Sequence, residues 1–216
     1  MKYKFVIFDW DGTLMDSAAK IVNCMQLAAR QCEVAIPSAE AVGGIIGISL
    51  RPAIQKLFNI TDEALTDRLF EAYKNAFIEQ DQTPSPMFNG AEQMLTSLKN
   101  SGRTLAVATG KARRGLDRAW KNTDTGHFFS FSRCADDAES KPSPDMILQL
   151  LAEAGVDKAD AVMIGDTTFD MQMAQDAGIA RIGVSYGVHA QVHLERFTPL
   201  AVVHSIAELE SLLLSQ

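Results

Sequence analysis

Short apolar runs rich in β-branched residues alternate along this chain with longer stretches of helical periodicity. Five runs are predicted strands, at residues 4–8, 104–108, 161–164, 180–184 and 200–203, and residues 129–133 form a weaker candidate. Such alternation is typical of a parallel sheet in which helices connect consecutive strands. Because crossover helices cover both faces of such a sheet, the sequence predicts an α/β fold.

The chain between the first two predicted strands, residues 9–103, is far longer than one crossover connection requires. Apolar residues recur there at helical spacing: Ile21, Met25, Ala28, Ile54, Leu57, Leu65, Leu69, Tyr73 and Phe77. The segment Thr83-Pro84-Ser85-Pro86 ends this pattern, because its two prolines cannot continue a helix. We therefore predict an all-α insert over residues 16–84 in a core formed by residues 1–15 and 85–216.

Composition argues against several classes of partner. The 27 acidic residues outnumber the 20 basic ones, and the net charge of −7 opposes binding to nucleic acid polymers and anionic membranes. Asp9 interrupts the amino-terminal apolar run, which is therefore neither a signal peptide nor a membrane-spanning helix. Three cysteines without a CxxC pair favour a reducing compartment. We expect a cytoplasmic protein that does not bind membranes.

Acidic residues follow two of the predicted strands. Asp9 and Asp11 point to the same side of an extended chain, and Asp166 and Asp170 follow the strand at 161–164. The carboxyl ends of parallel strands meet at one edge of a sheet, where ligands bind in open α/β folds. Four aspartates there would repel one another unless a cation neutralised them, and oxygen ligands favour Mg²⁺. The alternative is a pair of strand ends whose acids are solvated.

Two further segments carry groups suited to an anion. Thr109 and Gly110 follow the strand at 104–108 and offer a hydroxyl and a backbone N–H near the start of a helix. Lys141 precedes a predicted helix with Ser143 as its N-cap and Pro144 at its first position. Taken singly, these residues have ordinary alternatives, as a turn threonine and a solvated loop lysine.

In order along the chain, DxDGT, a threonine after the next core strand, Lys-Pro and GDxxxD resemble the four motifs of the haloacid dehalogenase superfamily. The segments DWDGTLMDS, ATGKARRGLDRAW and SKPSPDMI are similar to the branch that contains phosphoglycolate phosphatases. The resemblance implies a Rossmann-like sheet with helices on both faces and a helical cap domain, which matches residues 16–84. It also implies a Mg²⁺-dependent hydrolase of a small phosphorylated metabolite, such as phosphoglycolate or a sugar phosphate.

The resemblance assigns roles to the four aspartates. It implies that Asp9 is the nucleophile, forming an aspartyl-phosphate, and that Asp11 is the general acid and base. It also implies that Asp9, the Asp11 backbone carbonyl and Asp166 bind Mg²⁺, while Asp170 supports these ligands.

The resemblance assigns phosphate binding to Thr109, the Gly110 backbone and Lys141. The glycine-rich loop at residues 43–51 is the predicted selectivity element, in which Arg51 pairs with a substrate carboxylate or second phosphate. The alternative is a solvated arginine in a helix connection. We interpret the neighbouring cations as a solvated helix face rather than a basic rim of the site: Lys111, Arg113, Arg114 and Arg118.

Single positions separate the activities within the superfamily. Dehalogenases lack the second aspartate of the first motif, which is present here as Asp11. Mutases similar to β-phosphoglucomutase have a cap histidine where this chain has Ile21, and phosphonatases need a cap lysine that the loop at 43–51 lacks. A phosphosugar mutase, a nucleotide 5′-phosphatase and a catalytically silent partner-binding protein remain alternatives. We expect a monomer or a small homo-oligomer.

Overall fold

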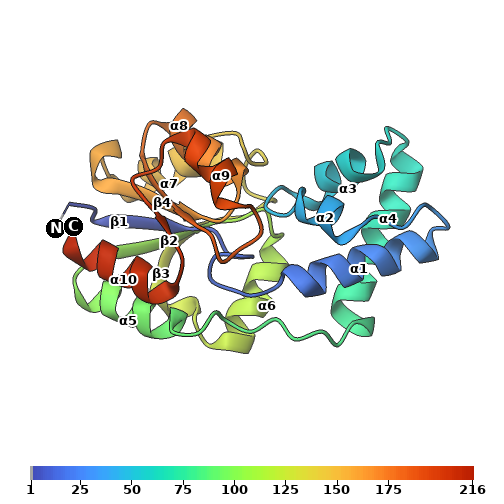
Figure 1. Cartoon of the computed structure of the whole chain (residues 1–216), viewed down its shortest axis with the longest axis horizontal. Helices are drawn as coiled ribbons and strands as arrows, with labels where there is room; N and C mark the ends of the chain where they lie inside the picture. Colours follow the sequence, from blue (N-terminus) through green and yellow to red (C-terminus); the bar gives the residue numbers. More distant parts are fainter. Residues whose placement is uncertain (1) are drawn as a thin grey trace.

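The computed structural model describes residues 2–216 and contains a six-stranded parallel sheet with the strand order β3-β2-β1-β4-β5-β6 (Figure 1). The strands are β1 (Phe5–Phe8), β2 (Thr104–Ala108), β3 (Phe129–Arg133), β4 (Ala161–Gly165), β5 (Ala180–Val184) and β6 (Val202–Val203). All five predicted strands are present, and so is the weaker candidate. The last strand is shorter than predicted, because its pairing with β5 begins at Val202.

Helices cover both faces of the sheet, which confirms the predicted α/β fold. One face carries α5 (Ala91–Asn100), α6 (Arg113–Thr123) and α10 (Ile206–Ser215), and the other carries α7 (Asp145–Ala154) and α8 (Thr168–Ala177). Side chains alternate along β1, so that Val6 and Phe8 join the first apolar cluster and Phe5 and Ile7 the second. Burial on both faces explains why the strand sequence is continuously apolar.

The elements between β1 and β2 form a helical insert: α1 (Ala18–Gln31), α2 (Ala39–Gly43), α3 (Leu50–Phe58), α4 (Glu63–Asn75) and the π-helical turn η1 (Ala76–Gln80). These helices lie at the right of Figure 1, clear of the sheet, and pack around their own apolar cluster. The chain enters the insert near Asp16 and leaves it near Pro86. These two connections run side by side and are joined by a hydrogen bond from Asp16 N to the Pro86 carbonyl at 2.8 Å. The predicted boundaries at residues 16 and 84 lie near this crossing and stay a prediction.

The remaining helical segments are short. They are η2 (Gly126–Phe128), η3 (Lys158–Asp160), α9 (Gln191–Leu194) and η4 (Glu195–Phe197). Within residues 2–216, no helix combines the length and the apolar character that crossing a bilayer requires.

Helix α7, which follows the predicted phosphate-binding lysine, begins one residue later than predicted. Pro144 is the N-cap, since its carbonyl accepts a hydrogen bond from Leu148 N at 3.0 Å. The prediction that Ser143 caps the helix is therefore wrong. Its hydroxyl donates to the Glu139 carboxylate at 2.9 Å, within the loop that carries Lys141, and accepts only a long hydrogen bond of 3.4 Å from Asp145 N.

Candidate active site

The predicted site residues come together at the carboxyl ends of three neighbouring strands. Strand β1 lies between β2 and β4, and its following residue, Asp9, donates its N–H to the Ile164 carbonyl of β4 at 2.9 Å. Thr109 follows β2, and Asp166 follows β4. Because the strands are parallel and in register, residues remote in the sequence meet at one edge of the sheet.

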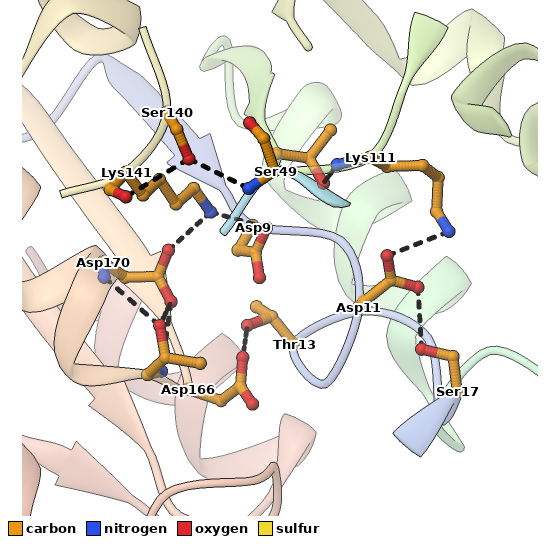
Figure 2. A network of polar contacts seen from close by, with 12 residues as sticks. Asp9, Asp11, Thr13, Ser17, Ser49, Lys111, Ser140, Lys141, Asp166 and Asp170 are labelled. Carbon is orange, nitrogen blue, oxygen red and sulfur yellow. Dashed lines mark hydrogen bonds and ion pairs between the residues drawn. The ribbon is translucent and has the colours of Figure 1, made fainter. Parts of the chain in front are cut away.

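A buried ammonium group bridges two buried carboxylates at this edge (Figure 2). Lys141 Nζ lies 2.7 Å from Asp9 Oδ1 and 2.6 Å from Asp170 Oδ1. All three side chains are almost inaccessible to solvent. Buried charges of this kind are tolerated only when paired and hydrogen-bonded, so this triad fixes the position of the Asp9 carboxylate.

Burial also shifts the ionisation of the groups in the triad and next to it. Desolvation raises the pKa of Asp9 from 3.8 to about 7, although Lys141 partly opposes the shift. Desolvation likewise raises the pKa of Asp166 well above its usual value, and the charges of Asp9 and Asp170 add to the effect. Burial alone would lower the pKa of Lys141, but the carboxylates of Asp170 and Asp9 outweigh it and raise this pKa. The cluster therefore carries excess negative charge that a cation would stabilise.

Three carboxylates form a candidate cation site. Asp9, Asp166 and Asp170 each place one oxygen within 4.8 Å of the others. Asp9 Oδ2 is buried and has no hydrogen-bond partner within residues 2–216. An unpartnered buried oxygen beside further carboxylates suits a hard cation such as Mg²⁺. The side chain of Asp170 is already engaged, because Oδ1 accepts from Lys141 and Oδ2 accepts from Thr167. Its supporting role at a metal stays a prediction.

Two residues that the sequence did not reveal orient Asp166. Thr13 Oγ1 donates to Asp166 Oδ1 at 2.9 Å, and Val188 N donates to Oδ2 at 2.8 Å. Gly12 also approaches closely, since a Cβ there would lie 2.2 Å from Asp166 Oδ2, and its φ is +84°. Only glycine suits that position. Thr13 belongs to the DGT segment, which is the signal that could have identified it.

Asp11 is held by a different set of partners. Ser17 Oγ donates to Asp11 Oδ1 at 2.7 Å, and Lys111 Nζ lies 2.9 Å from Asp11 Oδ2. Figure 2 shows the Asp11 carboxylate directed toward these two residues, whereas the Asp9 carboxylate is directed toward Lys141. Both aspartates line the same cavity, as predicted from their spacing. Their carboxylates nevertheless have separate counter-charges, so the two acids are suited to different roles.

The interpretation of Lys111 as part of a solvated helix face is wrong. Helix α6 begins at Arg113, so Lys111 lies in the loop after β2, and only 13% of its side chain is exposed. Lys111 follows Thr109 by two residues. Side chains two apart in an extended segment point to the same side, so this spacing could have identified Lys111 as a second residue directed into the site. The neighbouring Arg113 contributes its guanidinium to an ion pair with Asp137.

The loop that contains Thr109 and Gly110 also touches the helical insert. Thr109 is buried, and a Cβ at Gly110 would lie 2.5 Å from the Gly47 carbonyl oxygen and 2.7 Å from Ile48 C. Ser49 N donates to Ser140 Oγ at 2.9 Å, which ties the same insert loop to the segment before Lys141. The insert is therefore seated on the residues predicted to bind phosphate.

The Gly110→Ala substitution is expected to lower kcat/KM for the predicted hydrolysis of a phosphomonoester by about 100-fold. The added methyl group would displace the insert loop from the core by a fraction of an ångström or more. The matched control is Gly44→Ala in the insert, where the nearest atom to an added Cβ is 3.5 Å away. Steady-state kinetics and thermal unfolding of both variants check this result. Equal activity of the two variants would contradict it.

A cavity of about 860 Å³ lies between the insert and the strand ends. Arg51 lines it, but its guanidinium binds the carboxylates of Glu63, at 2.8 Å, and Asp67. The predicted contact of Arg51 with substrate stays a prediction. Arg114 and Arg118 on α6 also line the cavity.

The six-stranded parallel sheet and the buried aspartates at its edge define an α/β protein with an acidic site at the carboxyl ends of its strands. Residues 6–184 match the family model described as haloacid dehalogenase-like hydrolase, so the chain belongs to that family. The family predicted from the four motifs is thereby confirmed.

Named relatives agree with this assignment. The chain is 35% identical over 208 residues to the probable phosphatase IndB of Dickeya dadantii (strain 3937), covering 94% of this chain and 90% of the relative. It is 28% identical over 208 residues to a phosphoglycolate phosphatase of Agrobacterium fabrum (strain C58), covering 94% and 89%. The crystal structure of a predicted phosphatase from Clostridium acetobutylicum is 25% identical, with a TM-score of 0.89 and complete coverage of both chains. The prediction of a phosphatase is confirmed.

Proposed function

We propose that this phosphatase is a Mg²⁺-dependent phosphomonoester hydrolase that works through an aspartyl-phosphate on Asp9. The observation that carries the proposal is the asymmetric environment of the Asp9 carboxylate. Lys141 holds Oδ1 at 2.7 Å, whereas Oδ2 is buried without a hydrogen-bond partner among the described residues. A carboxylate fixed in this way beside a cavity is prepared for nucleophilic attack.

In the first step, a carboxylate oxygen of Asp9 attacks phosphorus and the bond from phosphorus to the ester oxygen breaks. Asp11, protonated at this stage, gives its proton to the departing oxygen, so the products are an alcohol and the aspartyl-phosphate. In the structure, Asp11 Oδ1 accepts a hydrogen bond from Ser17 Oγ, and Asp11 Oδ2 is occupied by the Lys111 ammonium at 2.9 Å. Asp11 therefore has to exchange its Lys111 contact for the leaving oxygen before it acts as the acid.

In the second step, Asp11 accepts a proton from water, and the water oxygen attacks phosphorus. The bond from phosphorus to the Asp9 oxygen breaks, which releases inorganic phosphate and restores both carboxyl groups. Thr109, the Gly110 N–H and the Lys141 ammonium hold the phosphoryl group and offset its charge during both steps. Lys141 is already ordered by its two ion pairs, so little reorganisation is needed.

Asp9, the Asp11 carbonyl and Asp166 would hold Mg²⁺, and Asp170 would support them through Lys141 and Thr167. The ion, when bound, supplies positive charge beside the transferred phosphoryl group. The helical insert, residues 16–84, is proposed as a cap domain that excludes bulk water from the site while the phosphoryl group is transferred to Asp9. The predicted cytoplasmic location and oligomeric state remain predictions.

We propose that the substrate is a small phosphorylated metabolite of the phosphoglycolate or sugar phosphate kind. The relative from Agrobacterium fabrum named phosphoglycolate phosphatase supports this class. A silent partner-binding role is less well supported, because Asp9, Lys141 and Asp170 are assembled into a buried charged triad. Hydrolysis of an aryl phosphate with and without Mg²⁺ tests the proposal. Loss of turnover in a chelator and its return with Mg²⁺ are expected, and no turnover on aryl or natural esters would overturn it.

The Asp166→Asn substitution is expected to weaken Mg²⁺ activation by at least about tenfold, because it removes a charged oxygen ligand from the cluster. Titration of activity with Mg²⁺ gives the half-saturating concentration. The control is Asp136→Asn, because Asp136 lines the cavity between the insert and the strand ends but lies outside the acidic cluster. Equal Mg²⁺ requirements in the two variants would remove Asp166 from the metal site.

A further inference from the structure

The cavity is large for the smallest of the substrates considered above. Its volume of about 860 Å³ is near the upper end of pockets that enclose drug-sized ligands. A two-carbon leaving group such as glycolate would occupy only a small part of it. The remaining space would accommodate a substrate with a larger group attached to its phosphate.

The insert lines this space mainly with apolar and aromatic side chains. They include Ile21, Met25, Phe70, Tyr73, Phe77 and Ile78. The Tyr73 and Phe77 rings form a tilted pair with centroids 5.9 Å apart. Phe77 belongs to the π-helical turn η1, a local departure from α-helical geometry that often occurs at functional sites. Lys20 Nζ and Lys111 Nζ lie 5.0 Å and 5.2 Å from the Phe77 ring centroid, so this wall suits apolar packing of a ring beside Tyr73 and Phe77.

The aromatic pair is next to the proposed general acid. Lys111 Nζ lies 5.2 Å from the Phe77 ring centroid and 2.9 Å from Asp11 Oδ2. Burial raises the pKa of Tyr73 well above its usual value, and the charge of Asp11 adds to the shift. Because Asp11 protonates the leaving oxygen, the carbon skeleton attached to that oxygen would lie beside these two rings.

Cations on the insert side of the cavity already have acidic partners. Arg51 binds Glu63 and Asp67, and Lys74 Nζ lies 3.0 Å from Glu71. A carboxylate on the leaving group would compete with these pairs. Arg114 and Arg118 have no ion pair within residues 2–216, but they line the cavity from α6 of the core and not from the insert. The insert thus favours an uncharged leaving group.

Resting on the proposed phosphomonoester hydrolysis, but in place of phosphoglycolate and sugar phosphates, we infer that the preferred substrates are phosphomonoesters of an alcohol that bears an uncharged aromatic or heteroaromatic ring. The ring packs against Tyr73 and Phe77, while the phosphate lies at Asp9 and Lys141. Apolar contacts of this size improve kcat/KM by roughly 10- to 200-fold per small group. A ring-bearing ester should therefore be hydrolysed much faster than phosphoglycolate.

Benzyl phosphate, ethyl phosphate and 2-phosphoglycolate provide the test, because all three release a primary alcohol and differ mainly in its substituent. With Mg²⁺ present, kcat/KM for benzyl phosphate is expected to exceed the other two values by at least about tenfold. Equal values, or a preference for 2-phosphoglycolate, would overturn the inference and leave the proposed function intact. Failure of all three esters and of the aryl phosphate would instead overturn the proposed function.

The Phe77→Ala variant tests the position of the ring. The ratio of kcat/KM for benzyl phosphate to that for ethyl phosphate should fall by about tenfold, because one wall of the ring site is lost. The ratio is independent of the folded fraction, so partial destabilisation does not mimic the result. Phe58→Ala is the control, since Phe58 packs in the same insert cluster but does not line the cavity. An unchanged ratio in Phe77→Ala would overturn the inference.

Discussion

Replacing Asp9 with Asn is expected to reduce phosphatase turnover by on the order of 10⁴-fold or more while leaving the protein folded. The activity falls because the amide lacks the negative charge that attacks phosphorus. Stability is expected to stay within about 1 kcal/mol, because the lost Lys141 contact is offset by removal of a costly buried charge. The raised pKa of Asp9, about 7, is a sign of that cost.

Kinetics on the aryl phosphate and urea unfolding in a chelator together check this prediction. Loss of activity with normal unfolding would support Asp9 as the nucleophile. Activity within tenfold of wild type would contradict the mechanism, whereas a large loss of stability would contradict the reasoning about the buried charge.

Replacing Lys141 with Met is expected to abolish activity and also to lower the free energy of unfolding by about 3–5 kcal/mol. The side chain is completely buried and is the counter-charge for both Asp9 and Asp170. Its loss leaves an uncompensated carboxylate pair near Asp166. Unfolding by urea in a chelator, followed by circular dichroism, gives the free energy directly.

Two additional measurements distinguish this charge effect from simple loss of packing. Asp170→Asn should restore part of the stability of the Lys141→Met variant, because it removes one of the unpaired charges. Stability of the variant should also rise as the pH is lowered from above 7, since a buried carboxyl group with a raised pKa binds a proton more readily in the folded state. The pKa of Asp9 is about 7 with Lys141 present, and loss of Lys141 removes the charge that opposes the rise.

The control is Lys4→Met, which removes a surface ion pair with Asp160 whose side chains are 61% and 38% exposed. That substitution should cost less than about 1 kcal/mol. A similar cost for Lys4→Met and Lys141→Met would contradict the role of the buried triad.

Much of the fold could be predicted because its signals are local. Continuous apolar runs such as residues 5–8 mark strands buried on both faces, and helical spacing marks the insert between them. The structure differs from the prediction at the start of α7. Ser143 was predicted to cap α7, but the helix begins one residue later and Pro144 is the N-cap. The Ser143 hydroxyl donates to Glu139 and accepts only a long hydrogen bond of 3.4 Å from Asp145 N.

The place of three candidate site residues in the fold could be predicted from the sequence, because each follows a predicted strand. Asp9, Thr109 and Asp166 occupy strand ends, and parallel strands necessarily bring such ends to one edge. Only the tertiary structure decided that Lys111 pairs with Asp11, that Arg51 is bound by Glu63 and Asp67, and that Gly47 contacts Gly110. The physical reason is separation along the sequence. The end of a strand depends on residues that are close in the sequence, whereas these contacts depend on how the insert and the core pack against each other at distances of a few ångströms.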